Sequence, residues 1–322
     1  MSSIPARPLA WAFTTGEAGM RTQARGLAQA VAATVVEKIA PPASPLNWLD
    51  TFIGGARLAG AFPPPWPDLL ITCGRRSAPY AAALKRASGG AILTVHIQDP
   101  RAFRSAFDLI IAMEHDSLVE RPGVIKVPTA LHDLTQPSLE EAGAAWKDRF
   151  TALGHPVAGV SIGGDLRGRP FSLVDASRLI AGLRRLRQEG HVALAITPSR
   201  RTPQAVRELL RETFGADPGV FIWDRTGANP YRAILALSDR LVVTTDSVSM
   251  VSEAIASGRP TELFDLDFPR HRDFVQTLID QGAARRFTGD PPPPAPGIPL
   301  DSTAIAARAV RRLLQERTGV CG

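Results

Sequence analysis

Apolar runs that suit buried strands alternate with amphipathic stretches along most of the chain. Strands buried on both faces read as continuous apolar runs, whereas helices repeat their apolar residues every three or four positions. The apolar run at 9–15, for example, is followed by Leu27, Val31 and Val35 at helical spacing. Strands that alternate with helices predict parallel sheets with right-handed crossovers.

The first half of the chain predicts one series of this kind. Its expected strands are 9–15, 68–74, 91–100, 107–113 and 123–131. Its expected helices are 21–38 and 77–88, with a glycine-bearing turn before the first of them. Residues 40–67 are rich in Pro and Gly and therefore predict mostly loop.

The second half repeats the alternation. Its expected strands are 156–165, 192–201, 219–224 and 239–246, and the stretch 247–266 should supply a helix and then a further strand. Other expected helices are 172–190, 202–215, 229–238 and 301–318. Gly190 should end the first of these helices, and Thr202 with Pro203 should begin the second.

Two such series predict an α/β protein with two Rossmann-like domains. The length of 322 residues agrees, because a single hydrophobic core rarely grows beyond about 250–300 residues. We predict an N-terminal domain at 1–131, a linker at 132–155 and a C-terminal domain at 156–290. A Pro-rich segment and a final helix follow at 291–322, and that helix could pack on either domain. Ligands of parallel sheets bind beyond the carboxyl ends of the strands, so the expected site is a cleft where the two sheets face each other.

Charge and cysteine content narrow the partners and the compartment. The net charge of +6 favours anionic partners, although the basic residues are nearly all Arg, which we attribute mainly to GC-rich codon usage. The two cysteines, Cys73 and Cys321, lie far apart in the sequence, so neither a disulfide framework nor a zinc site is expected. No signal peptide and no apolar run of about 18 residues stands out, so we expect a cytoplasmic protein that could still contact the inner-membrane surface.

The stretch 241–266 places polar side chains where a strand passes into a helix. These side chains are Thr244, Thr245, Asp246, Ser247 and Ser249. Ser247 or Asp246 can cap the helix, and the positive end of a helix dipole suits a phosphate group. A well-capped helix would explain one of these residues, but so many together favour contact with a ligand. Met250 and Glu253 lie further along the helix, where Glu253 could reach a sugar hydroxyl.

Other strand ends of the second half carry groups that suit a phosphorylated ligand. Gly163 and Gly164 would let backbone N–H groups approach an anion, or they form a simple turn. Arg binds phosphate oxygens in a bidentate manner, which would suit Arg200 and Arg201. The alternative for these arginines and Ser199 is a solvated loop. The remaining candidates are Ser199, Arg200, Arg201, Asn229 and Tyr231, the last two in either a turn or a loop that contacts a base or sugar.

The first half offers candidates for binding and acid–base work. Gly16 and Gly19 flank Glu17 directly after the first strand. Further strand ends carry Arg75 and Arg76, Gln98 and Asp99, and His115 and Asp116. Glu17, Asp99, His115 or Asp116 could act as a general base, although a single such residue in a loop is more often solvated or structural.

Familiar catalytic and nucleotide-binding motifs are absent from the sequence. It contains no GxGxxG dinucleotide fingerprint, no GxxxxGK[ST] loop, no GxSxG elbow and no HExxH pair. These absences argue against a serine hydrolase, a P-loop NTPase and a zincin.

Several of these segments together resemble the bacterial mitochondrial-fission ELM-type family. The resemblance runs from about residue 9 to 290 and is carried by GEAGMRTQARGLAQAV, SIGGD, SRRTP, the W-D-x-x-G-x-NPY pattern at 223–231 and VTTDSVSMVSEAIASGRP. More distantly, the family is similar to GT-B glycosyltransferases, notably the lipid-linked N-acetylglucosaminyltransferase of peptidoglycan synthesis. That similarity implies a nucleotide-sugar in the C-terminal domain and an acceptor in the N-terminal domain. The chain has Thr244 to Ser247 where those enzymes have a doubled glycine.

The resemblance leaves two hypotheses. The first is a metal-independent glycosyltransferase that takes a nucleoside-diphosphate sugar, expected to be UDP-linked, and transfers it to a lipid-linked or envelope acceptor. It implies no covalently bound cofactor, a possible anionic membrane surface as partner and no nucleic acid. Gly16, Gly19, Arg75, Arg76 and Gln98 would lie on the acceptor side. The second is a non-catalytic relative that keeps the fold as a scaffold for a membrane or a partner protein.

Overall fold

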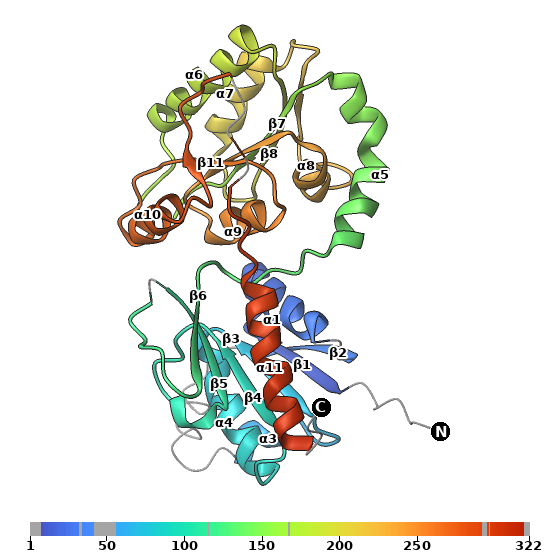
Figure 1. The fold of residues 1–322 in the computed structure, drawn as a ribbon, viewed down its shortest axis with the longest axis vertical. Helices are drawn as coiled ribbons and strands as arrows, with labels where there is room; N and C mark the ends of the chain where they lie inside the picture. Colours follow the sequence, from blue (N-terminus) through green and yellow to red (C-terminus); the bar gives the residue numbers. More distant parts are fainter. Residues whose placement is uncertain are drawn as a thin grey trace. The chain divides into compact units, whose positions relative to one another are not determined.

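The computed structural model describes residues 8–31, 34–41, 56–114, 116–166, 168–291, 295 and 297–318. The chain forms two compact units (Figure 1). The N-terminal unit comprises Met1–Asp133 together with Asp301–Gly322, and the C-terminal unit comprises Leu134–Leu300. Among the described helices, none is both long enough and apolar enough to cross a membrane.

The N-terminal unit is built on a parallel sheet with the strand order β2-β1-β3-β4-β5-β6. Its strands are β1 (Leu9–Thr14), β2 (Thr34–Ile39), β3 (Leu69–Cys73), β4 (Leu93–Ile97), β5 (Leu109–Met113) and β6 (Val124–Val127). The central strands β3 and β4 are buried along their whole length, which explains their continuous apolar runs.

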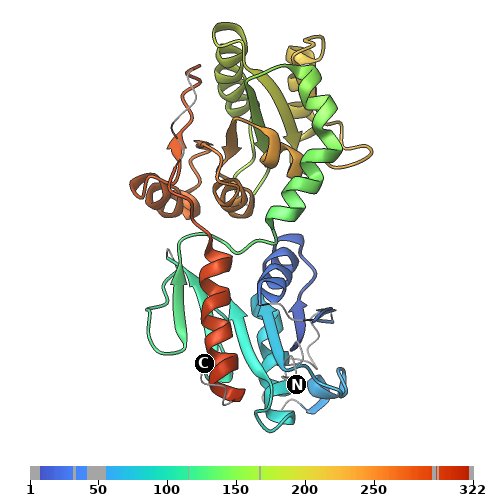
Figure 2. The ribbon, with the colours of Figure 1, turned by 45° about the vertical axis from the view of Figure 1, so that its right-hand side comes forward.

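Helices cover both faces of this sheet. One face packs against α1 (Ala18–Ala30) and α11 (Ser302–Thr318), and the other packs against α3 (Ala56–Gly60) and α4 (Ala78–Ala87). A short 3-10 helix, η1 (Arg75–Ser77), follows β3, and a second one, η2 (Arg104–Ala106), precedes β5. Helix α11, red in Figures 1 and 2, lies alongside β6 and α1, so the final helix packs on the N-terminal unit.

The helix predicted at 21–38 is wrong in its second half. Helix α1 ends at Ala30, and Thr34–Ile39 forms the edge strand β2, paired in parallel with β1. The run from Thr34 to Val36 consists of β-branched residues, which favour a pleated strand over a helix. Val35 still packs against the core formed by α1, but it does so from the sheet.

The C-terminal unit has a second parallel sheet with the order β12-β11-β10-β7-β8-β9. Its strands are β7 (Val157–Ile162), β8 (Ala193–Pro198), β9 (Val220–Ile222), β10 (Arg240–Thr244), β11 (Thr261–Phe264) and β12 (Arg285–Arg286). One face packs against α6 (Leu173–Glu189) and α7 (Gln204–Phe214). The other packs against α8 (Tyr231–Leu237), α9 (Val248–Ala256) and α10 (Arg272–Asp280), and a 3-10 helix, η3 (Pro269–His271), precedes α10. These sheets confirm the predicted α/β class with two Rossmann-like units.

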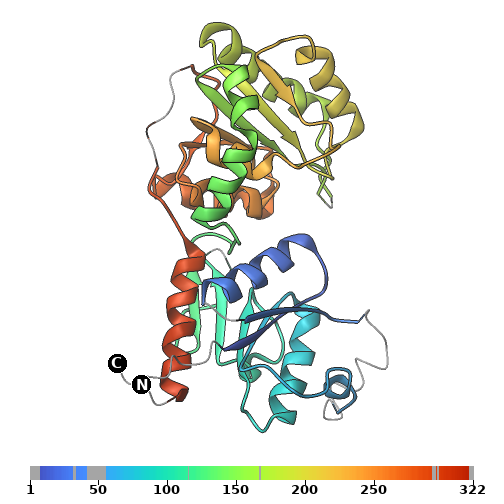
Figure 3. The same cartoon turned by 90° about the vertical axis from the view of Figure 1, so that its right-hand side faces the viewer.

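The segment 132–155, which the sequence suggested as a linker, is mostly helix. Helix α5 (Gln136–Leu153) packs against α8 within the C-terminal unit (Figure 3). Thr135 and Ser138 form a capping box, in which each side chain binds the backbone N–H of the other residue, so the helix has a fixed start. Trp146 and Phe221 join its far end to β9, with ring centroids 5.7 Å apart.

Candidate functional site

Each sheet has one point at which the strand order reverses. In the C-terminal unit the chain proceeds from β7 to β8 and β9 on one side, and β10 then lies on the other side of β7. The connection after β7 leads to α6 on one face, and the connection after β10 leads to α9 on the opposite face. Ligands of open parallel sheets bind where two such connections diverge. We call the carboxyl ends of β7 and β10 the C-terminal switch point.

The same reversal occurs in the N-terminal unit between β1 and β3. The chain continues from β1 to α1 and β2 on one side, whereas β3 lies on the other side and leads to α4 on the opposite face. We call the carboxyl ends of β1 and β3 the N-terminal switch point. The predicted residues Gly163, Gly164 and Thr245–Ser249 follow the first pair of strands, and Gly16, Glu17, Arg75 and Arg76 follow the second.

Asp246 ties the C-terminal switch point together. Its side chain is fully buried, with 0% exposure. One carboxylate oxygen accepts the Gly164 N–H at 2.9 Å and the Arg201 guanidinium at 2.9 Å, and the other accepts the Thr244 hydroxyl at 2.7 Å. Thr244 in turn accepts the N–H of Gly163 at 2.8 Å. Asp246 therefore connects the ends of β7, β8 and β10.

The two glycines allow this close packing. A Cβ on Gly163 would lie 2.0 Å from a carboxylate oxygen of Asp246, and a Cβ on Gly164 would lie 2.0 Å from the carbonyl oxygen of Arg201. The guanidinium of Arg201 also donates to the carbonyl of Asp165 at 2.9 Å. Since their N–H groups donate inward, the glycines are explained by contact between neighbouring loops.

Thr202 belongs to this network and does not cap helix α7 as predicted. The helix begins at Gln204, and Pro203 occupies the N-cap position. The Thr202 hydroxyl donates to the carbonyls of Ile162 and Gly163 at the end of β7. Thr202 is buried between the loops that follow β7 and β8, so its hydroxyl reaches the carbonyls at the end of the neighbouring strand β7.

The start of α9 presents the groups that remain available. Of the two caps that the sequence allowed, Asp246 and Ser247, Ser247 is the N-cap, and its hydroxyl accepts the Met250 N–H at 3.4 Å. Ser249 and Met250 are half-buried, and Arg200, at the end of β8, is exposed. Among the described residues, the side chains of Ser249 and Arg200 have no hydrogen-bond or ion-pair partner. The first amides of a helix also lack intrahelical acceptors.

Ser161 is a further polar group at this point that the sequence did not single out. It lies in β7 between Val243 of β10 and Thr197 of β8. Alternation along the strand places it on the face of α8 and α9, because Val160 and Ile162 pack on the α6 face. Its hydroxyl is buried and has no hydrogen-bond partner in the described part of the chain. A serine inside an apolar strand gives no distinctive signal in the sequence.

A second missed group lies beyond β11. The Thr245 hydroxyl accepts the Leu266 N–H at 3.1 Å and donates to Asp265 at 3.4 Å, and the Thr245 carbonyl lies 2.8 Å from Nδ1 of His271. The neighbouring η3 thus brings a half-buried imidazole next to residue 245. The signal was Asp265 and His271 shortly after the strand that the sequence predicts at the end of 247–266, but only the fold shows that both lie beside Thr245.

The other predicted residues of this unit lie at the start of α8, within α9 and directly after β8. The side-chain carbonyl of Asn229 accepts the Tyr231 N–H at 3.0 Å and so forms the turn that begins α8. The Tyr231 hydroxyl donates to the carboxylate of Glu253 on α9. Ser199 is half-buried, and its hydroxyl accepts the N–H of Arg201 at 3.2 Å. Tyr231 and Glu253 therefore form one polar pair between the two helices.

At the N-terminal switch point, Glu17 and Arg76 lie within electrostatic range of each other. A hydrogen bond from the Thr15 hydroxyl lowers the pKa of Glu17, and the Arg76 guanidinium lowers this pKa further. Gly16 has a positive φ of 95° and donates its N–H to Thr14, which turns the chain into α1. Gly19 lies half-buried in the first turn of that helix.

The end of β4 holds the remaining described candidates. Gln98 adopts a left-handed conformation, with φ of 80°, and its N–H still donates to Ile111 at 2.8 Å. Asp99 is buried, and burial raises its pKa, but the Arg101 N–H and the Arg104 guanidinium bind the carboxylate and lower the pKa below the usual range of an aspartate. Such an ionised, doubly bound carboxylate is poorly placed to act as a base. His115 lies outside the described residues, and Asp116 accepts the Met113 N–H at 3.0 Å.

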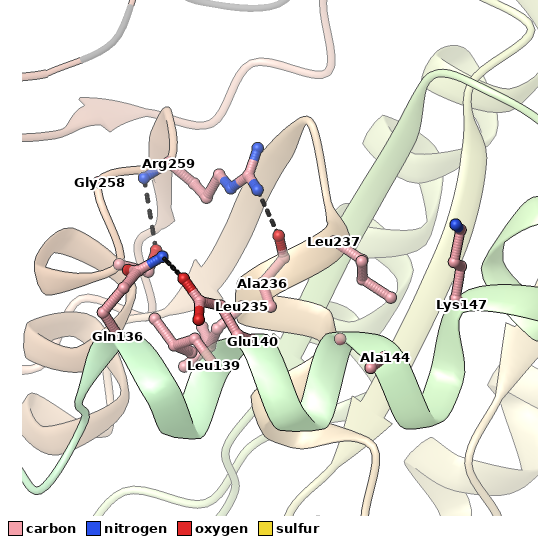
Figure 4. A pocket seen from close by; sticks show the side chains of 12 residues that line it. Gln136, Leu139, Glu140, Ala144, Lys147, Leu235, Ala236, Leu237, Gly258 and Arg259 are labelled. Atoms are coloured by element: carbon pink, nitrogen blue, oxygen red, sulfur yellow. Dashed lines mark hydrogen bonds between the residues drawn. The ribbon is translucent and has the colours of Figure 1, made fainter.

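Two hollows of the C-terminal unit lie apart from most predicted residues. The larger, of about 590 Å³, lies between α5, the end of α8 and the turn after α9, at the amino ends of the strands (Figure 4). Arg259 there donates to the carbonyl of Ala236, and Gln136 to Glu140. The smaller, of about 310 Å³, lies beside β9 and is lined by aromatic residues that include Trp146 and Trp223. Among the described residues, no three His, Cys, Asp or Glu side chains are grouped to hold a metal ion.

Solved structures with the same fold include enzymes of UDP-sugar metabolism. A UDP-GlcNAc 2-epimerase from Methanocaldococcus jannaschii superposes with a TM-score of 0.63 at 12% identity, covering 95% of this chain and 99% of the other. The UDP-GlcNAc 2-epimerase from Neisseria meningitidis bound to UDP-GlcNAc gives 0.57 at 13% identity, over 96% and 92%. Spinosyn forosaminyltransferase gives 0.50 at 14% identity, over 97% and 95%. At these identities the likeness establishes the GT-B-like fold.

Sequence comparison identifies the family. The Arabidopsis thaliana protein named mitochondrial fission protein ELM1 is 32% identical over 278 residues, which cover 78% of this chain. The match spans 65% of the Arabidopsis protein. The profile of the family described as mitochondrial fission ELM1 matches residues 18–314. The chain therefore belongs to the mitochondrial fission ELM1 family, in agreement with the resemblance seen in its motifs.

Proposed function

We propose that the C-terminal unit binds a nucleoside-diphosphate sugar, UDP-linked, at its switch point, and that the protein transfers the sugar to a lipid-linked or envelope acceptor. The observation that carries this proposal is a group of polar side chains where β7, β8 and β10 end, for which the described part of the chain offers no hydrogen-bond or ion-pair partner. These are Ser161, Arg200 and Ser249, which accompany the start of α9. Structural neighbours whose names include UDP-GlcNAc support the choice of ligand.

The geometry suits a diphosphate. The first amides of α9 and the dipole of the helix favour negative charge, and Ser249 adds a hydroxyl donor. Arg200 adds an exposed guanidinium, which binds phosphate oxygens strongly. Arg201, by contrast, is bound to Asp246 and fixes the loops. Groups that are held in place before binding can stabilise charge as the diphosphate leaves.

The pair of Tyr231 and Glu253 fits the sugar part of such a ligand. Glu253 lies about one and a half turns into α9, and the Tyr231 hydroxyl orients its carboxylate. A carboxylate fixed in this way can accept hydrogen bonds from two neighbouring sugar hydroxyls. The candidate ligand would then lie along α9, from phosphate at its start to sugar at Glu253.

A non-catalytic scaffold is the competing function, and one observation favours it. Thr244, Thr245 and Asp246, which the sequence suggested as ligand contacts, are buried and bonded within the protein. A scaffold for a partner or a membrane requires the fold but no ligand at the switch point. Binding of a nucleotide separates the two functions.

The test is calorimetric titration with UDP, UDP-GlcNAc and other nucleotide-sugars, together with melting temperatures. A ligand that binds only the folded state raises the melting temperature. We expect Ser249→Ala and Arg200→Ala each to weaken binding by roughly 1–3 kcal/mol, because a ligand oxygen loses its partner. Arg225→Ala, on the exposed loop after β9, removes an equal charge and serves as the control. Wild-type affinity in both test variants, or no binding of any nucleotide, would count against the enzyme.

We also propose peripheral association with an anionic membrane surface, on the inner face of the cytoplasmic membrane. Support comes from the net charge of +6 and from exposed arginines such as Arg184 on α6 and Arg308 on α11. Each basic residue near such a surface contributes about 1 kcal/mol. Flotation with phosphatidylglycerol vesicles at low salt should carry the protein upward, and vesicles of phosphatidylcholine should not. A protein that stays in the bottom fraction with both would refute this association.

A further inference from the structure

We propose that the start of helix α6 inserts into an anionic membrane, with Leu173 and Val174 as the inserting side chains and the arginines of the same helix on the lipid phosphates. This inference rests on the proposed membrane association, for which it names the contact surface. All the residues involved belong to the C-terminal unit.

Leu173 and Val174 form an exposed apolar tip in the first turn of α6, the yellow-green helix labelled in Figure 1. Leu173 is 52% exposed and Val174 is 71% exposed. In the part of the chain that the structure describes, the other large apolar side chains with such exposure lie far apart in the sequence: Ile39, Val119 and Ile298. Single exposed apolar residues are normal on a protein surface, but two adjacent ones at the end of a helix give a joint apolar surface.

Polar side chains that turn inward hold the backbone around this apolar tip. Ser172 and Asp175 form a capping box, which fixes the start of α6. Arg169 donates to the Asp175 carboxylate at 3.2 Å and to the Leu266 carbonyl at 2.7 Å. The Asp175 side chain is buried, so its carboxylate presents little negative charge at the surface. The apolar tip is therefore held in place before any membrane is present.

Basic side chains continue from the apolar tip along the exposed face of α6. Spacings of three and four residues mark one face of a helix, and the exposed residues at these spacings are Val174, Arg178, Ala181 and Arg185. Arg184 is exposed beside them. The side chains of Arg178 and Arg185 are 58% and 48% exposed, so their ion pairs are largely solvated and leave both cations available for a lipid phosphate.

An anionic membrane suits this arrangement better than a protein partner does. Helices at a membrane surface bury apolar side chains about 5–10 Å deep, while the long arginine side chains reach back to the headgroups. Arg178 lies about 6 Å from Val174 along the helix axis, at 1.5 Å per residue, which agrees with that depth. A standard protein interface buries about 800 Å² on each partner, far more than two side chains supply.

Insertion at this point would bring the C-terminal switch point close to the lipid. The loop that begins at Gly163, directly after β7, leads into α6. The apolar tip and the switch point therefore share the carboxyl edge of the sheet. A lipid-linked acceptor is the class of substrate that such a position serves.

The experiment measures the binding of the full chain to vesicles of phosphatidylcholine and phosphatidylglycerol in equal amounts, over a series of salt concentrations. Leu173→Ser/Val174→Ser should weaken binding at least about tenfold at every salt concentration, because salt does not screen an apolar contact. Arg184→Gln/Arg185→Gln should weaken binding by roughly fivefold for each arginine at low salt, and this loss should disappear at high salt.

Two control variants separate the apolar tip from apolar exposure in general. Val119→Ser/Ile298→Ser removes two exposed apolar side chains elsewhere and should bind as wild type does. Leu173→Ile/Val174→Ile keeps the apolar surface and should also bind as wild type does. A depth measurement completes the set: Leu173→Trp should show more fluorescence quenching by lipids brominated in their acyl chains than wild type shows, and Val119→Trp should not.

Several outcomes would overturn the inference. Wild-type binding by Leu173→Ser/Val174→Ser would do so, as would an equal loss in Val119→Ser/Ile298→Ser. A mass that rises with concentration in light scattering, absent from the Leu173→Ser/Val174→Ser variant whose vesicle binding is unchanged, would assign the tip to a second copy of the chain. If wild type binds no vesicle at all, the proposed membrane association fails as well. Failure of the proposed transferase function has a different signature, because no nucleotide then binds wild type while vesicle binding is unaffected.

Discussion

At the C-terminal switch point the charged pair of Asp246 and Arg201 is bound into the protein, whereas at the N-terminal switch point Arg75 and Arg76 are exposed and without partners in the described chain. The two points share their topology and their position at the carboxyl ends of parallel strands. They differ in whether a carboxylate at the same edge of the sheet forms an ion pair with the cations. A strand end rich in charged residues can therefore be either a fixed frame or an available site, and only the bonding pattern distinguishes the two.

The largest expected effect tests the bonded network around Asp246, which joins Gly163, Gly164, Arg201 and Thr244 and which we call the frame. Asp246→Ala should lower the free energy of unfolding by roughly 3 kcal/mol, because it leaves a buried N–H, a buried hydroxyl and a guanidinium without their acceptor. Urea unfolding of both proteins measures the difference. Asp267→Ala is the matched control, since its side chain is 77% exposed and its pair with Arg272 should contribute at most about 1 kcal/mol. A loss below about 1 kcal/mol for Asp246→Ala would show that the network is not a frame.

A somewhat smaller effect is expected for the glycines of the frame. Gly164→Ala should cost about 2 kcal/mol of stability, because its Cβ would lie 2.0 Å from a backbone carbonyl and the loops must shift. Gly60→Ala, at the end of α3, has nothing within 4 Å of the new Cβ and should leave stability unchanged or slightly higher. Thermal unfolding of the two variants compares them directly. Similar melting temperatures would mean that the loops at Gly164 adapt without cost.

The sequence was sufficient for the architecture because buried parallel strands are continuous apolar runs. It misassigned 34–39, where Val35 satisfied a helical period by coincidence and the β-branched run decided for a strand. It also treated 132–155 as a linker, although the capping pair Thr135 and Ser138 marks a helix start. In both places a local pattern indicates the observed structure: the β-branched run indicates the strand, and the capping pair indicates the helix. The helical spacing of Val35 and the need for a boundary between two domains pointed the other way.

For the candidate site, the positions at strand ends could be predicted from the sequence, but the bonds between them could not. Asp246 and Arg201 lie 45 residues apart in the chain, and their pairing depends on the order of β8, β7 and β10 in the sheet. Thr202 could not be distinguished from a helix cap for the same reason. Whether the predicted residues bind a ligand stays a prediction, since hydrogen bonds within the protein show only which groups are already satisfied.

The two serines at the start of α9 sharpen the comparison between frame and site within a single turn. Ser247→Ala should lower stability by about 1 kcal/mol, because its hydroxyl caps the helix. Ser249→Ala should change stability by less than about 0.5 kcal/mol, because its hydroxyl has no partner among the described residues. Chemical unfolding of the two variants measures both values. An equal loss in both would place Ser249 in the frame and weaken its assignment to the ligand.

The smallest effect concerns Asp99, the carboxylate that neutralises Arg101 and Arg104 beside the N-terminal switch point. Its folded-state pKa is lowered from the ordinary value of an aspartate, so its ionised form stabilises the fold at pH values above that ordinary value, and this contribution disappears as the pH falls through the lower, folded-state pKa. The stability difference between wild type and Asp99→Asn should therefore be constant from pH 7 to pH 5 and shrink below about pH 4. Urea unfolding across that range measures it. The effect of Asp99→Asn made in the Arg104→Gln background should depend less on pH, because one of the groups that lowers the pKa of Asp99 is gone. A difference that stays constant down to pH 3 would mean that Asp99 is not the ionised partner of these arginines. The contrast with Arg75 and Arg76, which form no ion pair with any described residue, would then lose its basis.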